Sequence, residues 1–221
     1  MRAILLGPVI GAGDAIEFLR SLRVGPQDLC VGVDGGTQVW LDAGYRPHFA
    51  VGDWDSLRLK NKILPGIPTL SLSKNKDRSD LYFAARAAMK WDIQELICLG
   101  VTGGERFDHH LATLYDLSIF ASGKYGKLKS VSAIGVEGEY HFLSEAIPQW
   151  KGSFLKRRLV SVFAMGGRAT GVTFSGFQFL LKNATLFPSS LGLSNWTQKR
   201  KCEVHLRKGQ LLVILPRNGV N

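Results

Sequence analysis

Cysteine is scarce in this chain of 221 residues, and its three copies, Cys30, Cys98 and Cys202, stand far apart. Disulfide frameworks and zinc sites require cysteines at closer, paired spacing. We therefore expect three buried free thiols in a reducing compartment, and a cytoplasmic protein.

Long apolar runs are also lacking. No stretch approaches the roughly 18 residues that a membrane span needs, and the apolar start of the chain turns acidic at Asp14 and Glu17. We interpret this start as a first strand and turn rather than a signal peptide. The sequence therefore predicts no membrane partner.

Acidic residues are few relative to basic ones, with 18 Asp and Glu against 28 Lys and Arg and a net charge of +10. Such a charge suits either nucleic acid or a small polyanion such as a nucleotide. The basic residues cluster only in residues 156–158 and 198–208, without the interleaved aromatics of known nucleic-acid motifs. We interpret both clusters as solvated basic faces and do not expect nucleic acid as a partner.

Three well-known motif classes are absent. The sequence contains neither the G-x-x-x-x-G-K-[ST] phosphate loop nor a G-x-G-x-x-G after a strand, which excludes an ordinary P-loop kinase or dinucleotide enzyme. Its five histidines form no H-x-x-x-H or Cys/His grouping, so zinc is not expected either.

Short apolar strands alternate with helical patterns over the first 120 or so residues, as expected for βαβ units with a largely parallel sheet. The expected strands are 3–7, 29–34, 48–53, 68–73 and 95–101, and the expected helices are 13–22, 35–44, 79–91 and 107–122.

The second half of the chain has a different pattern. Short strand candidates follow one another, separated by Gly, Pro and Asn, with no helix of useful length among them. This pattern predicts an all-β sandwich or barrel. We therefore expect an α/β domain in residues 1–145 and a β-sandwich-like domain in residues 146–221.

Aspartates gather where the predicted strands end and helices begin. Asp34 closes the second strand, Asp53 and Asp55 follow the third, and Asp80 and Asp108 open helices. Ligands of parallel sheets bind beyond the carboxyl ends of the strands, and carboxylates crowded there would repel each other without a cation between them. Mg²⁺ prefers oxygen ligands and shares them with substrate phosphates, so the pattern predicts a magnesium site.

Glycine pairs supply the other half of a phosphate site. Gly35 and Gly36 precede one helix, and Gly103 and Gly104 precede another. Glycine lets the backbone approach a ligand closely, and helix N-termini present free N–H groups to anions. Arg106, beside the second pair, has the side chain to pair bidentately with a phosphate.

Several of these stretches together resemble the thiamine pyrophosphokinase family. The matching elements are D-G-G at 34–36, G-x-x-P at 44–47, G-D-x-D-S at 52–56, K-D-R-S-D at 76–80 and G-G-E-R-F-D-H at 103–109. The resemblance covers most of residues 30–118 and continues more weakly in the β-rich half. It implies an α/β domain, a β-sandwich and a homodimer with active sites at the subunit interface.

The implied reaction transfers the diphosphate of ATP to thiamine, giving AMP and thiamine diphosphate. The thiamine hydroxyl attacks the β-phosphorus, and either Asp53 or Asp55 could accept its proton. By motif position, the residues implied for Mg²⁺ and catalysis are Asp34, Asp53, Asp55 and Asp80. Those implied for ATP are Gly35, Gly36, Lys76, Gly103, Gly104, Arg106, Asp108 and His109.

Thiamine itself is implied to bind in the β-rich half. Ser194 and Asn195 match a Ser-Asn element of the family, and Phe179 lies where the family often has Trp. The Phe179 ring is expected to stack on thiamine, a contact worth about 0.5 to 2 kcal/mol.

Besides Ser79 in place of the usual Thr and an atypical opening turn, the sequence departs from the family pattern at three positions. Glu105 is an extra residue before Arg106, Tyr82 replaces an acid, and Trp196 stands where an acid is common. Two alternatives therefore stay open. One is a related diphosphokinase for another alcohol, such as a pterin or a thiamine analogue. The other is a non-catalytic protein that senses nucleotide or thiamine diphosphate, or binds nucleic acid through its basic C-terminal half.

Overall fold

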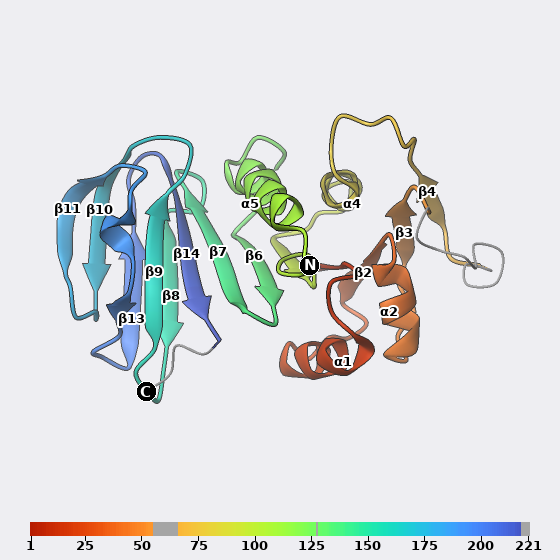
Figure 1. The fold of residues 1–221 in the computed structure, drawn as a ribbon, viewed down its shortest axis with the longest axis horizontal. Coiled ribbons are helices and arrows are strands. Elements are labelled where there is room, and N and C mark those ends of the chain that lie inside the picture. The colour runs from red at the N-terminus through yellow and green to blue at the C-terminus, as the bar shows by residue number, and fades with distance from the viewer. Residues whose placement is uncertain (55–65, 127, 218–221) are drawn as a thin grey trace. The chain divides into compact units, whose positions relative to one another are not determined.

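The computed structural model describes residues 1–54, 66–126 and 128–217 (Figure 1). Asp55, one of the predicted metal ligands, lies outside these residues. The chain divides into two compact units. Unit 1 comprises Met1–Asp116 and Ala133–Val136, and unit 2 comprises Leu117–Ser132 and Glu137–Asn221.

Unit 1 is built on parallel strands. They are β1 (Arg2–Leu6), β2 (Asp28–Val33), β3 (Phe49–Gly52), β4 (Thr69–Ser71) and β5 (Glu95–Leu99). Their order is β5-β1-β2-β3-β4, and every pair among them is parallel. The strands β1, β2, β3 and β5 are almost fully buried, as expected for a sheet covered on both faces. The predicted parallel arrangement is confirmed for this part of the sheet.

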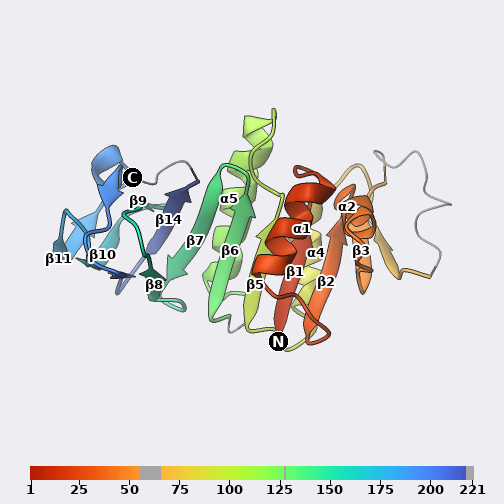
Figure 2. The same ribbon diagram turned by 90° about the horizontal axis from the view of Figure 1, so that it is seen from below.

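Helices cover both faces of these strands. They are α1 (Ala12–Ser21), α2 (Gly36–Asp42), α4 (Asp80–Ala88) and α5 (Phe107–Ala121), the last of which runs from unit 1 into unit 2. Figure 2 shows α1 and α2 on one face of the parallel strands and α4 on the other. The helices cover the faces of the sheet, whereas the carboxyl ends of β2 and β3 continue directly into the segments that carry the predicted site residues.

The N-terminus of α4 is capped by a side chain. Ser79 Oγ accepts a hydrogen bond from the Tyr82 backbone N–H at 3.1 Å, which satisfies one of the N–H groups that a helix start leaves without a partner. The sequence predicts this cap. Because the helix begins directly after Ser79, Asp80 lies in the first turn of α4.

Unit 2 is built from antiparallel strands. They are β7 (Gly138–Ser144), β8 (Gln149–Ser153), β9 (Leu159–Ala164), β10 (Ala169–Ser175), β11 (Leu181–Leu186), β12 (Asn195–Trp196), β13 (Lys201–His205) and β14 (Gln210–Pro216). One set has the order β12-β9-β14-β7 and the other the order β11-β10-β13-β8. A single buried apolar cluster contains Val162 of β9, Val172 of β10, Val204 of β13 and Val213 of β14. The β-rich second half is therefore as predicted.

The strand β6 (Ser130–Gly135) belongs to both units. In the strand order it neighbours β5 on one side and β7 on the other. Because β7 pairs with β14 antiparallel, the sheet that begins with the parallel strands is mixed. The expectation of a largely parallel sheet therefore holds for β1 to β5 and needs correction beyond them, where the alternation of strands and helices ends.

All three cysteines are buried free thiols, as the sequence predicts. No helix within the described ranges is long and apolar enough to span a membrane.

Candidate active site

The predicted site begins where β2 and β3 end side by side. Asp34 follows β2 in a left-handed conformation, with φ of 46°, and its backbone N–H donates to the Val51 carbonyl at 2.8 Å. A side chain at Gly52 would lie 3.0 Å from the Asp34 Cα. The two strand ends therefore meet closely, because position 52 carries no side chain.

Trp54 holds the turn that carries Asp53. Its backbone is also left-handed, with φ of 63°, and its indole Nε1 donates to Ser71 Oγ at 3.0 Å. A bulky residue is uncommon in this conformation, which costs about 1–3 kcal/mol and persists only where the surroundings impose it. Burial of the Trp54 ring and its hydrogen bond supply that constraint for residues 53 and 54, directly after β3.

Lys76 bridges two of the predicted carboxylates. Its Nζ lies 2.6 Å from Asp53 Oδ2 and 3.4 Å from Asp80 Oδ2. Burial works against the charged lysine, but the hydrogen bond to Asp53 and the charge of Asp80 outweigh it and raise the pKa of Lys76. The lysine therefore stays charged between the two carboxylates.

The pKa of Asp80 is shifted by burial and by the charged groups around it. Burial raises its pKa, Lys76 opposes this, and the negative charges of Asp53 and Asp34 raise it further. Its Oδ1 is buried and has no hydrogen-bond partner within the described part of the chain. Asp34, Asp53 and Asp80 therefore interact electrostatically, and the buried Oδ1 of Asp80 is left for a further ligand.

These residues fit a magnesium site that substrate completes. Among the described residues, no group of three or more His, Cys, Asp or Glu side chains could hold a metal ion by itself. Mg²⁺ commonly takes only one or two carboxylates and fills its remaining positions with water and substrate phosphates. The buried Asp80 oxygen, which has no hydrogen-bond partner among the described residues, matches that requirement.

Asp116 is a member of this region that the sequence patterns did not predict. It is 6% exposed, and its Oδ2 accepts a hydrogen bond from Ser79 Oγ at 2.5 Å. Burial raises its pKa, against the opposing effects of Ser79 and Arg78. A signal was present, because Asp116 stands between the buried Thr113 and Phe120 at spacings of three and four residues, on the buried face of a helix.

The first glycine pair is needed for packing. A Cβ at Gly36 would lie 1.9 Å from the Leu6 carbonyl oxygen, whereas a Cβ at Gly35 would meet Pro8 at 3.1 Å. The start of α2 therefore packs directly against the end of β1, and Gly36 is indispensable to that contact.

The second glycine pair has positive φ values of 80° at Gly103 and 75° at Gly104. The Gly103 N–H donates to His110 Nδ1 at 2.9 Å, so it is used inside the loop. The predicted residue His109 is exposed, and its neighbour His110 is the one that braces the loop. Adjacent histidines point to different sides of a helix, and the sequence could not distinguish their roles.

Arg106 and Asp108 form an ion pair with each other. Arg106 Nε lies 2.8 Å from Asp108 Oδ1, and Nη2 lies 2.5 Å from Oδ2. This bidentate pair lowers the pKa of Asp108, mainly through the hydrogen bonds from Arg106. Both side chains are exposed at the start of α5.

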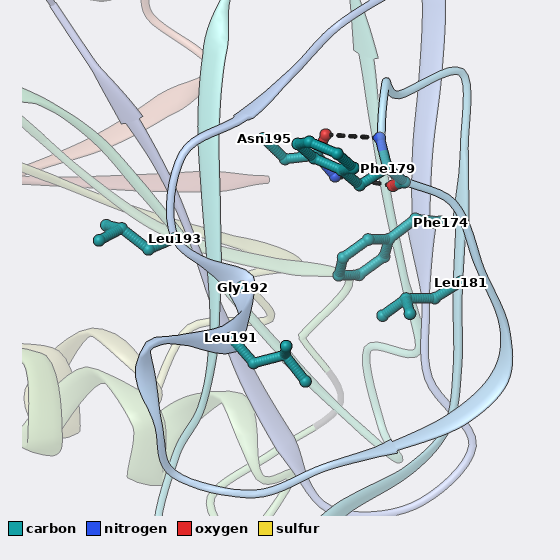
Figure 3. Close-up of a pocket in the computed structure, with 7 residues that line it drawn as sticks. All are labelled: Phe174, Phe179, Leu181, Leu191, Gly192, Leu193 and Asn195. Carbon is teal, nitrogen blue, oxygen red and sulfur yellow. Dashed lines mark hydrogen bonds between the residues drawn. The ribbon is translucent and has the colours of Figure 1, made fainter.

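The predicted thiamine residues lie in unit 2, around an apolar hollow of about 350 Å³. Asn195 is 5% exposed and holds Phe179 by two hydrogen bonds, from the Phe179 N–H to Oδ1 at 3.0 Å and from Nδ2 to the Phe179 carbonyl at 2.8 Å. Figure 3 shows this clamp at one side of the hollow. The hollow is lined by Phe174, Phe179, Leu181, Leu191, Gly192, Leu193 and Asn195.

Ser194 contributes through its backbone. It has a φ of 60°, and its N–H donates to Ser161 Oγ at 3.0 Å. The Phe179 side chain is 62% exposed at the hollow. The Ser-Asn element therefore fixes the loop that presents the Phe179 ring.

Two family models match the chain. The catalytic domain of thiamin pyrophosphokinase matches residues 24–126, and the vitamin B1 binding domain of thiamin pyrophosphokinase matches residues 147–211. The chain belongs to the thiamin pyrophosphokinase family. The first match contains Lys76 and the aspartates Asp34, Asp53, Asp55 and Asp80, which together we call the carboxylate group. The second match contains Phe179 and Asn195.

Individual relatives agree with this membership. A thiamine pyrophosphokinase from Bacillus subtilis (strain 168) is 28% identical over 193 residues, which cover 84% of this chain and 86% of the relative. Solved thiamin pyrophosphokinases share the fold. The structure from Bacillus subtilis has a TM-score of 0.81 at 24% identity, covering 98% of this chain and 99% of that one. The structure from Candida albicans has a TM-score of 0.76 at 15% identity, covering 97% and 88%.

Proposed function

We propose that this member of the thiamin pyrophosphokinase family transfers the diphosphate of ATP to the hydroxyl of thiamine, with Mg²⁺ bound at the carboxylate group. The new bond joins the thiamine oxygen to the β-phosphorus, and the bond between the α,β-bridging oxygen and the β-phosphorus breaks, so AMP leaves. One observation carries the proposal. Lys76 bridges Asp53 and Asp80, and the buried Oδ1 of Asp80 has no hydrogen-bond partner among the described residues.

Asp34, Asp53, Asp55 and Asp80 are the residues that would hold the metal, directly or through water. When bound, Mg²⁺ supplies positive charge to the phosphate oxygens as negative charge develops there. The buried Oδ1 of Asp80 supplies an oxygen ligand whose desolvation cost is otherwise uncompensated. Either Asp53 or Asp55 accepts the thiamine hydroxyl proton.

Lys76 has two parts in this proposal. Without substrate its ammonium holds Asp53 and Asp80 in place, at 2.6 Å and 3.4 Å. With ATP bound, the same ammonium can donate to a phosphate oxygen, because it has three N–H donors. Phosphoryl transfer depends mainly on such positioning and charge neutralisation.

The ATP phosphates and ribose are proposed to contact the two glycine turns and the start of α5. The residues are Gly35, Gly36, Lys76, Gly103, Gly104, Arg106, Asp108 and His109. Arg106 is paired with Asp108 and would exchange one of these hydrogen bonds for a phosphate oxygen. The exposure of this pair keeps the cost of that exchange small.

Thiamine is proposed to bind at the apolar hollow of unit 2. The exposed Phe179 ring would stack on a thiamine ring. Asn195 would keep Phe179 in position through the two hydrogen bonds between its side chain and the Phe179 backbone. A cationic thiazolium gains electrostatically from an aromatic face. Ser194 acts here through the backbone conformation of the loop.

A homodimer is proposed as the working form. Unit 2 exposes a set of large apolar side chains, and such patches mark association surfaces. Its members are Phe179, Leu180, Phe187, Leu191 and Leu193. We also propose a cytoplasmic location, which the three buried free thiols support.

The test is to incubate the purified protein with ATP, Mg²⁺ and thiamine and to separate the products. Equal amounts of AMP and thiamine diphosphate are expected. If folded protein forms no thiamine-dependent AMP, the acceptor assignment is wrong, and pterin alcohols and thiamine analogues are to be tried next. If no AMP forms with any of these acceptors, the protein binds its ligands without catalysing diphosphate transfer, and the proposed reaction is wrong.

A further inference from the structure

A second hollow in unit 2 lies outside the proposed thiamine and carboxylate sites. It has a volume of about 190 Å³ and lies open to solvent between two short segments, residues 154–157 and 197–200. We call it the basic hollow. It is lined by Phe154, Leu155, Lys156, Arg157, Thr197, Gln198, Lys199 and Arg200.

The two segments are far apart in sequence but are fastened together by backbone hydrogen bonds. The Phe154 N–H donates to the Arg200 carbonyl at 2.8 Å, and the Thr197 N–H donates to the Arg158 carbonyl at 2.9 Å. Thr197 Oγ1 in turn accepts from the Arg158 N–H at 2.9 Å. The walls of the basic hollow are therefore held in a fixed spacing before any ligand arrives.

One of its cations is also fixed in direction. The Arg157 guanidinium lies 5.3 Å from the centroid of the Trp196 ring, and its Nη2 donates to Gln178 Oε1 at 2.9 Å. Stacking and hydrogen bonding reduce the conformational entropy that an exposed arginine otherwise loses on binding. Arg157 is preorganised as a donor at this site.

The charge of the basic hollow is entirely of one sign. Four of the eight residues that line it are Lys or Arg, and none of these eight is acidic. Arg158 and Lys201 directly follow the two segments. Like charges gathered on two segments that the fold brings together destabilise the folded state, and an anion between them removes that cost.

We propose that the basic hollow binds the di- or triphosphate group of a small anion. Its volume is below the roughly 300–1,000 Å³ of sites that enclose drug-sized ligands, so it suits a compact and highly charged group. Arginine and lysine are the side chains that recognise phosphate oxygens. A nucleic acid strand would instead need a basic stripe interleaved with aromatic platforms, whereas these cations surround one hollow.

The proposal does not depend on the proposed catalytic function, because it involves other residues and needs no metal. Inorganic pyrophosphate is the first probe, titrated calorimetrically into the full-length protein in the presence of EDTA. Chelation removes the Mg²⁺ through which the carboxylate group would bind phosphates. The wild-type protein is expected to bind pyrophosphate at one site.

The test variant is Lys199→Gln/Arg200→Gln, which removes two cations of the basic hollow and keeps the backbone hydrogen bond of residue 200. The matched control is Arg207→Gln/Lys208→Gln, which also removes one arginine and one lysine from an exposed segment of unit 2. Pyrophosphate affinity is expected to fall at least about tenfold in the test variant and to change little in the control.

ATP and thiamine diphosphate serve as further probes under the same conditions. Tighter binding of one of them than of pyrophosphate, with the same loss in the test variant, would identify the molecule that carries the phosphate group. Equal binding of all three would mean that the site recognises the phosphates alone.

Three results would overturn the proposal. One is no pyrophosphate binding to the wild-type protein at about 1 mM, where even a weak site would be occupied. Another is an equal loss of affinity in both double variants, which would mean a diffuse positive field and no defined site. The third is binding of a single-stranded oligonucleotide that pyrophosphate does not displace.

Discussion

Ser79 and Asp116 form a hydrogen bond of 2.5 Å that links the start of α4 to the middle of α5. The carboxylate of Asp116 can only accept, so the single Ser79 hydroxyl proton points to it. A lone pair of the Ser79 oxygen then accepts from the Tyr82 N–H at 3.1 Å. Asp116 therefore orients the cap of the helix whose first residue is Asp80.

Asp116→Ala is expected to lower the free energy of unfolding by about 1–2 kcal/mol, because the cap loses its orienting partner. Asp116→Asn retains an acceptor oxygen and is expected to recover most of the loss. Urea denaturation measures both variants. The exposed Asp92 supplies the control Asp92→Ala, and equal destabilisation by Asp116→Asn and Asp116→Ala would contradict this role for the hydrogen bond.

Asp53→Asn is expected to reduce kcat at least about 100-fold while the protein stays folded, because the amide cannot supply a charged metal ligand. Initial rates of AMP formation at saturating ATP, thiamine and Mg²⁺ measure the effect. Asp92→Asn is the matched control. Normal turnover by Asp53→Asn would remove this residue from the proposed metal site.

Asp80→Asn is expected to stabilise the metal-free protein at neutral pH. The folded pKa of Asp80 is raised, chiefly by burial, so its contribution to stability is present below the ordinary carboxyl pKa and is lost as the pH rises through the raised value. The gain should therefore shrink on acidification, as the wild-type carboxyl becomes protonated.

Unfolding of wild type and Asp80→Asn in EDTA, at neutral and at acidic pH, checks this sign. Activity is expected to be lost at the same time, since functional carboxylates are often held at a cost in stability. A destabilised Asp80→Asn at neutral pH would mean that the contact with Lys76 outweighs the burial of Asp80.

Phe179→Ala is expected to raise the KM for thiamine about tenfold and to leave the KM for ATP nearly unchanged, because the exposed ring would lose its stack on thiamine. Steady-state kinetics with each substrate varied in turn separates the two effects. As a control, Phe187→Ala removes another phenylalanine of the proposed association surface that does not line the apolar hollow, so an effect shared by both variants would come from that surface and not from the stack. Equal rises in both KM values for Phe179→Ala would indicate a structural role instead.

Gly36→Ala is expected to cost more than about 3 kcal/mol or to prevent folding, since its Cβ would lie 1.9 Å from the Leu6 oxygen. A Cβ at Gly13, in α1, would instead point into open space, with no neighbouring atom within 4 Å. Gly13→Ala is therefore expected to stabilise by about 0.5–1 kcal/mol. Thermal unfolding compares the two, and similar effects would refute the close packing of α2 on β1.

The sequence predicts the aspartate cluster because carboxyl ends of parallel strands meet at one edge, whatever the details of packing. Asp34, Asp53 and Asp80 follow that rule. The sequence does not predict the role of Asp116, because this residue lies in the middle of a helix. Its role depends on which residue of another helix its side chain contacts. That information is tertiary and has no local pattern.

The basic segments illustrate the same limit in unit 2. From the sequence, residues 156–158 and 198–208 are interpreted as separate solvated faces. Only the pairing of β12 with β9 and the adjoining backbone hydrogen bonds bring the first cluster close to the start of the second. Antiparallel register depends on the whole set of strands. The two hydrogen bonds between Asn195 and Phe179 likewise have no signal in the sequence, although the family motifs indicate both residues.

Lys76 has one more consequence. Because its ammonium already lies between Asp53 and Asp80, the carboxylates have a resident counter-charge, and folding need not wait for an ion from solution. With Mg²⁺ bound as proposed, protein that lacks the ion would stay folded and inactive, and it would regain activity when the ion returns, with no new synthesis.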